Sequence, residues 1–174
     1  YEARKAGDLF ASFMDEGRIE KLGLAPLHEV FAQITEAYVQ GREALVAQLG
    51  RLERGGSEGL WQLFIDNDPG NPEKYVMFIE QGGLGLPDES YYRDESFQEI
   101  RDAYVAHLER VFTLTGLEEP AERAQRVLAL ETQLASHHWD NVRSRDAEAT
   151  YNPTSVAELR EVMAGFPLDS WRES

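Results

Sequence analysis

Apolar residues recur every three or four positions along most of the chain, a spacing that places them on one face of an α-helix. The first such segment opens the chain, and we expect its apolar side to be buried. That side comprises Ala6, Leu9, Phe10, Phe13 and Met14. A second helix is predicted from Pro26, a residue favoured in the first helical turn, to Gly41. Its apolar face comprises Leu27, Val30, Phe31, Ile34 and Tyr38. A third helix is predicted from about Arg42 to Arg54.

The glycine-rich stretch GGSEG, residues 55–59, ends this helix, and two runs of aromatic and β-branched residues follow it. They flank a turn-forming sequence, residues 68–72, and therefore predict a β-hairpin with a longer loop. The strands are expected near Leu60 to Ile65 and Tyr75 to Glu80. Both runs are too apolar for a sheet with one face in water, so we expect both faces to be covered.

Helical spacing returns after the hairpin. A long amphipathic helix is predicted to stop at Gly116, and its apolar face comprises Phe97, Ile100, Tyr104, Val105, Leu108, Val111 and Phe112. Another helix is predicted from about Pro120 to Trp139, and SVAE, residues 155–158, has the capping-box form that begins a shorter one. The sequence thus predicts a mainly α fold, a multi-helix domain with one small β-hairpin. A length of 174 residues suits one compact domain, residues 1–174.

Composition narrows the classes of partner and chemistry. The 32 acidic and 17 basic residues give a net charge of -15, which argues against nucleic acid or an anionic membrane as a partner. No segment approaches the roughly 20 apolar residues of a membrane span. The absence of cysteine excludes disulfides, thiolate zinc sites and a cysteine nucleophile, and it leaves the compartment open. Both ends resemble cuts within a longer sequence, so we interpret the chain as a piece of a larger protein.

The adjacent histidines His137 and His138, with Glu131 and Asp140 nearby, raise the question of a metal site. Successive helical residues point about 100° apart, so the two rings cannot reach one ion while the helix continues. Glu131 shares a face with His138, but seven residues separate their backbones by roughly 10 Å. We therefore interpret the histidine pair as a cap of the helix C-terminus. A metal-binding helical protein that uses His137 and His138 remains the lesser hypothesis.

No other arrangement of residues predicts a catalytic site. His28 and His107 stand alone on polar helix faces without ligand spacing, and acid pairs such as Glu118 and Glu119 are interpreted as solvated. The chain has no H-E-x-x-H, no G-x-S-x-G and no phosphate loop. We therefore assign no catalytic and no metal-binding residue, and the residues that bind substrate stay unassigned.

The stretch QGGLGLPDESYY, residues 81–92, resembles the Q-x-G-L-x-L-P-x-x-x-Y-Y signature of neprilysin-type zinc metallopeptidases, the family of neprilysin and endothelin-converting enzyme. The matching residues are Gln81, Gly83, Leu84, Leu86, Pro87, Tyr91 and Tyr92. Three further stretches agree in order, namely NPEKY, VLALETQLA and YNPTSVAEL. The opening KAGDLFASFMDE and the later LGLAPL are similar to bacterial members, a likeness that the lack of cysteine fits. In physical terms, Gly82, Gly83 and Gly85 allow tight turns, and Pro87 stops the strand.

The resemblance implies a two-lobed peptidase whose lobes enclose a chamber. One lobe resembles thermolysin and holds zinc through H-E-x-x-H and a downstream glutamate. The other is a mostly helical lid that restricts access to small peptides, and this chain corresponds to that noncatalytic N-terminal lobe. Its expected partners are the catalytic lobe of the same chain and small peptide substrates, and zinc is expected only in the catalytic lobe. The alternative is a stand-alone helical interaction module that has lost the catalytic lobe.

Overall fold

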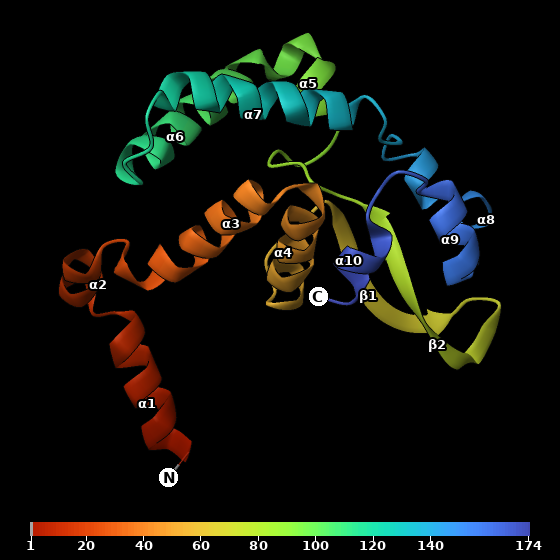
Figure 1. The fold of residues 1–174 in the computed structure, drawn as a ribbon, viewed down its shortest axis with the longest axis horizontal. Helices are drawn as coiled ribbons and strands as arrows, with labels where there is room; N and C mark the ends of the chain where they lie inside the picture. The colour runs from red at the N-terminus through yellow and green to blue at the C-terminus, as the bar shows by residue number, and fades with distance from the viewer. Residues whose placement is uncertain (1) are drawn as a thin grey trace.

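The computed structural model describes residues 2–174, in which helices predominate around a single two-stranded antiparallel sheet (Figure 1). The α-helices are α1 Glu2–Phe13, α2 Glu16–Leu22, α3 His28–Gln40, α4 Arg42–Arg54, α5 Ser90–Arg93, α6 Gln98–Leu114, α7 Pro120–Ala135, α8 Ala147–Thr150, α9 Val156–Val162 and α10 Leu168–Arg172. The 3-10 helices are η1 Ala25–Leu27, η2 Glu95–Phe97 and η3 Arg143–Arg145, and the strands are β1 Trp61–Asp68 and β2 Asn71–Gln81. This confirms the prediction of a mainly α fold with one small hairpin. None of the described helices combines the length and the apolar character that a membrane crossing requires.

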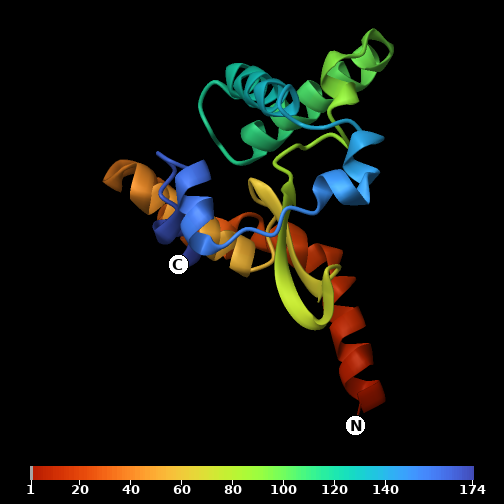
Figure 2. The same cartoon turned by 90° about the vertical axis from the view of Figure 1, so that its right-hand side faces the viewer.

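Helix α1 projects away from the rest of the fold, and the prediction that its apolar side is buried is wrong for this chain (Figures 1 and 2). Leu9, Phe10 and Phe13 are 73%, 66% and 76% exposed. The reason is that no described helix or strand packs along α1. The chain turns after α1 because the Asp15 side chain accepts a hydrogen bond from the Arg18 amide at 3.0 Å. That bond caps α2, a helix that the sequence pattern did not predict.

Helix α4 has the predicted bounds, whereas α3 begins at His28 and the predicted start, Pro26, lies in η1. The two α-helices pack against each other across Gly41. Gly41 has a φ of 111°, a conformation that favours glycine, and this allows the sharp reversal. The predicted apolar face of α3 is only partly covered, since Phe31 and Tyr38 stay exposed. Helix α4 instead covers the neighbouring stripe that contains Ala37, which is 5% exposed. The amide of Gln48 on α4 donates to Gln33 on α3 at 3.4 Å along the same stripe.

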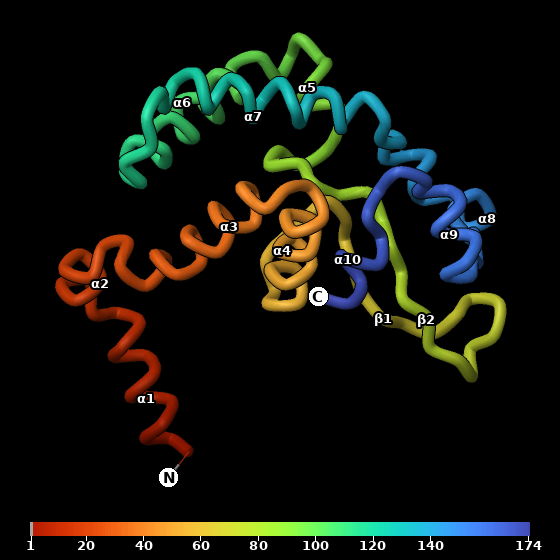
Figure 3. Tube along the Cα trace, viewed as in Figure 1, coloured from red at the N-terminus to blue at the C-terminus, as the bar shows by residue number. Residues whose placement is uncertain are grey.

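The first core joins α4, β1 and the C-terminal helix α10, which returns beside α4 (Figure 3). Its buried members are Val46, Leu168 and Trp171, with Trp61, Leu63, Leu159, Met163 and Phe166 packed against them. The Trp61 ring meets those of Phe166 and Trp171 edge-on, with centroids 5.1 and 5.2 Å away. The Trp171 indole N–H donates to the Glu53 carboxylate at 2.5 Å. The C-terminal residues are therefore part of this core.

The hairpin is longer, and its turn is tighter, than the sequence predicted. The strands pair from Trp61 with Gln81 to Asp68 with Asn71, so the expected longer loop is wrong. The Asp68 carboxylate accepts from the Gly70 amide at 2.9 Å and from the Tyr151 hydroxyl at 2.7 Å, and these bonds hold the turn. The expectation that both faces are covered is also not met within the described residues. Ile65, Tyr75 and Met77, near the tip, are 72%, 73% and 54% exposed.

Helices α6 and α7 form an antiparallel pair that lies across the top of Figure 1. Gly116, with a φ of 71°, follows the end of α6 as predicted, and the Ser155 capping box of α9 is confirmed. Helix α7 ends at Ala135, four residues before the predicted Trp139. No residue of α6 is fully buried, because α7 packs against only one side of that helix. A second core between the pair and the preceding loop contains Leu86, Tyr92 and Ala135, with Leu84, Tyr91, Tyr104 and Leu128 packed against it.

Candidate functional site

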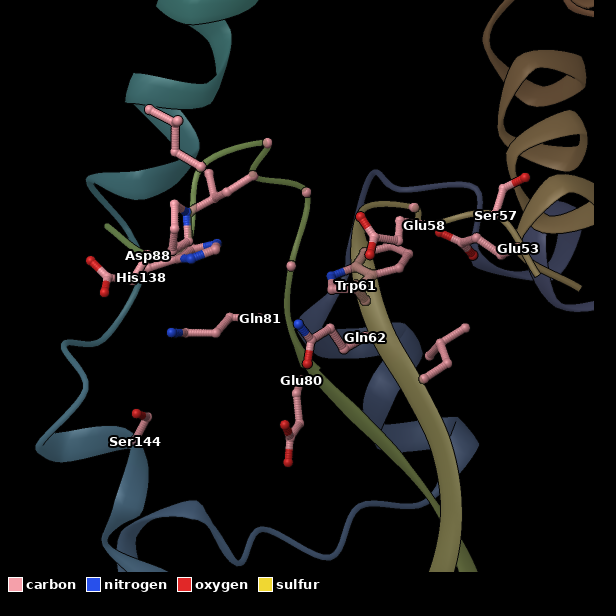
Figure 4. Close-up of a pocket in the computed structure, with 18 of the residues that line it drawn as sticks. Glu53, Ser57, Glu58, Trp61, Gln62, Glu80, Gln81, Asp88, His138 and Ser144 are labelled. Atoms are coloured by element: carbon pink, nitrogen blue, oxygen red, sulfur yellow. The ribbon is translucent and has the colours of Figure 1, made fainter. Parts of the chain in front are cut away.

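A cleft of about 770 Å³ lies between the base of the hairpin, residues 82–88 and the segment that follows α7 (Figure 4). Residues 82–88 belong to the family signature and are here called the glycine loop. Gln62 and Glu80 project into the cleft from the two strands, and His138 and Ser144 line the opposite wall. The cleft therefore brings the signature sequence next to His138, although the two are remote in the sequence.

Gln81 fixes the distance between the two walls. Its side-chain amide donates to the Trp139 carbonyl at 3.0 Å, and its carbonyl oxygen accepts from the Trp139 amide at 2.8 Å. The side chain thus replaces a backbone partner and ties the end of β2 to the segment after α7. This explains why the signature begins with glutamine, because both a donor and an acceptor are required.

The glycines of the signature are required by close packing as well as by turning. A side chain at Gly82 would place its Cβ 2.8 Å from the Trp61 carbonyl carbon and 2.9 Å from the Gln62 nitrogen. At Gly85 the Cβ would overlap the Tyr104 hydroxyl. Gly83 has a φ of 80°, which favours glycine for conformational reasons. The sequence predicted the tight turns, and the structure adds the close contacts.

The half-buried carboxylate of Glu131 and two tyrosines hold the glycine loop against α7. The Tyr92 hydroxyl donates to Glu131 at 2.9 Å and accepts from the Leu86 amide at 2.9 Å. The Tyr104 hydroxyl donates to the other Glu131 oxygen at 2.9 Å. Burial raises the pKa of both tyrosines, and the hydrogen bonds to Glu131 and its negative charge raise it further. The Leu86 amide opposes this effect on the pKa of Tyr92.

We expect the raised tyrosine pKa values to make the fold sensitive to alkali. Above pH about 10 a tyrosine in the unfolded chain loses its proton, whereas Tyr92 and Tyr104 in the folded chain keep theirs. The unfolded state then binds fewer protons, so the free energy of unfolding falls as pH rises. Urea melts between pH 9 and about 11 should show a steeper fall for the wild type than for the Tyr92→Phe/Tyr104→Phe double variant. An equal fall in the free energy of unfolding for both proteins would contradict the raised pKa values of Tyr92 and Tyr104.

The structure places the histidine pair in the turn after α7, whose C-cap residue is Ser136. The predicted contact with the last carbonyls of the helix is made by the backbone, since the His137 and His138 amides donate to the Leu134 and Ala135 carbonyls at 2.9 and 3.1 Å. Ser136 follows the end of α7, and its hydroxyl, rather than either imidazole, donates to the Gln133 carbonyl at 2.7 Å. His138 turns toward the Gly82 backbone; burial lowers its pKa, and that contact partly offsets the effect. Asp140 accepts from the Val142 and Arg143 amides at 2.9 and 2.8 Å.

The remaining residues weighed from the sequence lie apart from the cleft. His28 is the first residue of α3 and His107 is exposed on α6. Glu118 and Glu119 are exposed, and Glu119 lies 3.8 Å from Arg126. Across residues 2–174, no three His, Asp or Glu side chains are grouped so that they could hold a metal ion.

Acidic and amide side chains line the cleft. Glu58, Glu80 and Gln62 offer oxygen atoms that can accept hydrogen bonds (Figure 4). Ser57 and Ser144 stand on different walls, and Figure 4 shows neither beside His138. Sequence reasoning missed the pairing of Asn141 with Asp88, at 2.7 Å, because 53 residues separate the two.

A comparison with known protein families gives a match over the whole chain. The model of the N-terminal region of peptidase family M13 matches residues 1–174, which is the whole chain. The chain belongs to peptidase family M13. The resemblance of residues 81–92 to the neprilysin-type signature is thereby confirmed, and the M13 signature acquires a structural role. Its glutamine, glycines and second tyrosine join the hairpin to the helical pair.

Relatives of this M13 chain include vertebrate and bacterial proteins. Human endothelin-converting enzyme-like 1 is 31% identical over 91% of this chain and 22% of its own length. Guinea pig (Cavia porcellus) endothelin-converting enzyme 1 is 28% identical over 97% of this chain and 23% of its own length. A crystal structure of Mycobacterium tuberculosis zinc metalloprotease Zmp1 with an inhibitor has a TM-score of 0.90 and 42% identity, covering 96% of this chain and 26% of Zmp1. The chain thus spans about a quarter of the length of these proteins.

Proposed function

We propose that this M13 chain is the noncatalytic N-terminal lobe of a zinc-dependent endopeptidase, with residues 1–174 as a single helical domain. In this proposal the lobe covers the active-site chamber and restricts access to small peptides. The observation that carries the proposal is the close correspondence with one segment of Zmp1, a protein named as a zinc metalloprotease. The corresponding segment is about a quarter of that chain.

The internal bonding of the signature supports a structural role for this lobe. Gln81, Tyr92 and Glu131 bond to other parts of the same lobe. A zinc peptidase needs about three protein ligands around the metal and a carboxylate that takes a proton from the bound water. In this proposal the zinc and the catalytic residues lie in the remainder of the parent protein. The expected partners are that catalytic lobe and small peptides.

The proposal predicts a division of activity between parent and lobe. The full-length parent should hydrolyse a quenched fluorescent peptide, lose this activity with a chelator and regain it with zinc. Residues 1–174 alone should neither hydrolyse the peptide nor keep stoichiometric zinc after dialysis, as measured by elemental analysis. A 1:1 zinc complex of the isolated lobe that is lost in a His137→Ala/His138→Ala variant would overturn the assignment.

Substrate size tests the lid role separately. The parent should cleave short peptides and leave the same sequence intact when it is embedded in a folded protein or a long unfolded chain. Equal rates for short and long substrates at equal concentration would contradict a covered chamber. The alternative, a stand-alone interaction module, predicts a parent coding sequence without H-E-x-x-H and a protein without zinc-dependent hydrolysis.

A further inference from the structure

One face of the hairpin carries polar side chains at its base and aromatic side chains further along. Cross-strand partners in a sheet share a face, and so do residues two apart on one strand. Leu63, between two of these positions on β1, points the other way and packs against the first core. The face opposite to Leu63, here called the hairpin face, comprises two cross-strand pairs, Gln62 with Glu80 and Phe64 with Phe78.

The aromatic part of the hairpin face is open to solvent. The rings of Phe64 and Phe78 stack, with centroids 4.8 Å apart and planes that differ by 4°. Phe64 is 41% exposed, so the stack can be reached by another molecule. Aromatic rings bind apolar side chains through buried area and attract cations through the ring quadrupole. This part of the face therefore suits an apolar or aromatic side chain.

The acidic part lies at the base of the hairpin, within the cleft (Figure 4). Four carboxylates line the cleft, and none of the described residues around it is a lysine or an arginine. Glu53 and Asp88 already accept hydrogen bonds from other parts of the lobe. Glu58 and Glu80 are exposed and have no such partner within residues 2–174. The concave, acidic and partly unpaired site is complementary in charge to a basic side chain.

We propose that the hairpin face binds an extended peptide in which a basic and an apolar side chain are two residues apart. The basic side chain enters the cleft beside Glu80, with Glu58 adding to the attraction, and the apolar one lies on the phenylalanine stack. Alternate residues of an extended peptide lie on one side, about 6.6 Å apart, which matches the spacing of Glu80 and Phe78 on β2. Lys74, near the tip of the hairpin, disfavours the reverse orientation.

The inference rests on the proposed function, because it requires peptides to enter the parent protein, and it adds a preference among them. The net charge of -15 favours the same class of peptide at long range. The hairpin face differs from a purely apolar surface, since its free carboxylates select the charge of the occupant. That selection makes the occupant testable with peptides that differ in one residue.

Peptide binding to the full-length parent tests the hairpin face, with the metal removed by a chelator so that no peptide is cleaved. The probes are fluorescent peptides that contain Arg-Ala-Phe or Glu-Ala-Phe in otherwise identical neutral sequences. Fluorescence anisotropy should give a Kd about fivefold or more lower for the arginine peptide, since an exposed ion pair contributes up to about that factor. A peptide with Ala-Arg-Phe, in which the two side chains are adjacent, should bind more weakly than Arg-Ala-Phe. Equal affinities for the arginine and glutamate peptides would overturn the proposal.

Variants of the parent locate the preference. Glu58→Gln/Glu80→Gln keeps the shape of both side chains and should remove the preference for arginine. Glu73→Gln is the matched control, because Glu73 is an exposed acid near the tip of the same strand. The control should keep the preference of the wild type. A preference that survives in the double variant, or that Glu73→Gln removes equally, would contradict binding at the hairpin face.

Two further measurements separate the remaining outcomes. A photo-crosslinker beside the arginine should attach to residues 58–64 or 78–82, and attachment only elsewhere in the parent would overturn the proposal. Hydrolysis of a neutral peptide by the zinc-loaded parent keeps the two proposals apart. Hydrolysis without any preference for arginine overturns the hairpin face alone. The preference without hydrolysis supports the hairpin face and contradicts the proposed function.

Discussion

Trp171→Ala is expected to lower the free energy of unfolding of residues 1–174 by about 3 to 5 kcal/mol. The indole is 7% exposed and packs in the core with Val46 and Leu168. Its removal leaves a cavity, and it also takes the indole donor away from the Glu53 carboxylate. The loss should exceed that of any other single alanine substitution in the first core, because no other buried side chain there combines a large ring with a side-chain hydrogen bond.

Urea denaturation measures this effect through the midpoint and the slope of the transition. Leu114→Ala is the matched control, because Leu114 is also a large apolar residue but is 77% exposed at the end of α6. We expect the control to change the free energy of unfolding by less than about 0.5 kcal/mol. Similar losses in both variants would show that α10 does not close the core in solution.

Glu131→Ala is expected to lower the free energy of unfolding by about 2 to 4 kcal/mol, since it removes the acceptor of two tyrosine hydroxyls. Each buried hydroxyl left without a partner costs about 1 to 3 kcal/mol, and Tyr104 is less buried than Tyr92. Glu131→Gln keeps one acceptor oxygen and should lose less.

Glu122→Ala provides the control for Glu131 on the same helix. Glu122 lies 3.6 Å from Arg126, but its side chain is 70% exposed, and such surface pairs contribute about 0 to 1 kcal/mol. The two alanine variants should therefore differ clearly in urea melts. If Glu131→Ala were as mild as Glu122→Ala, the glycine loop would not depend on the tyrosine pair.

Long periodic segments of the fold were predictable from the sequence. Helix α4 has the predicted bounds, and the Ser155 capping box is formed, because local spacing and local hydrogen bonds determine both. Short helices such as α5 and α10, of four and five residues, have too few residues to show a period. Their positions depend on packing against distant parts of the chain.

The limits of prediction at the cleft have the same origin. The sequence identified the signature as a family feature, but the partner of Gln81 is the backbone of Trp139, 58 residues away. Glu131 attracted attention as a possible metal ligand, and the structure shows both of its oxygens bound to tyrosines. Likewise, the amphipathic spacing in α1 identified its apolar side. The spacing does not say whether residues 2–174 include a segment that packs against that side.

The order of synthesis determines when the first core can close. Trp61 is synthesised about 110 residues before Trp171, whose ring packs against it. At about 5 to 20 residues per second, a ribosome needs roughly 5 to 20 seconds to reach that tryptophan. During this interval the base of the hairpin carries exposed aromatic surface, which the nascent chain can bury only after α10 emerges.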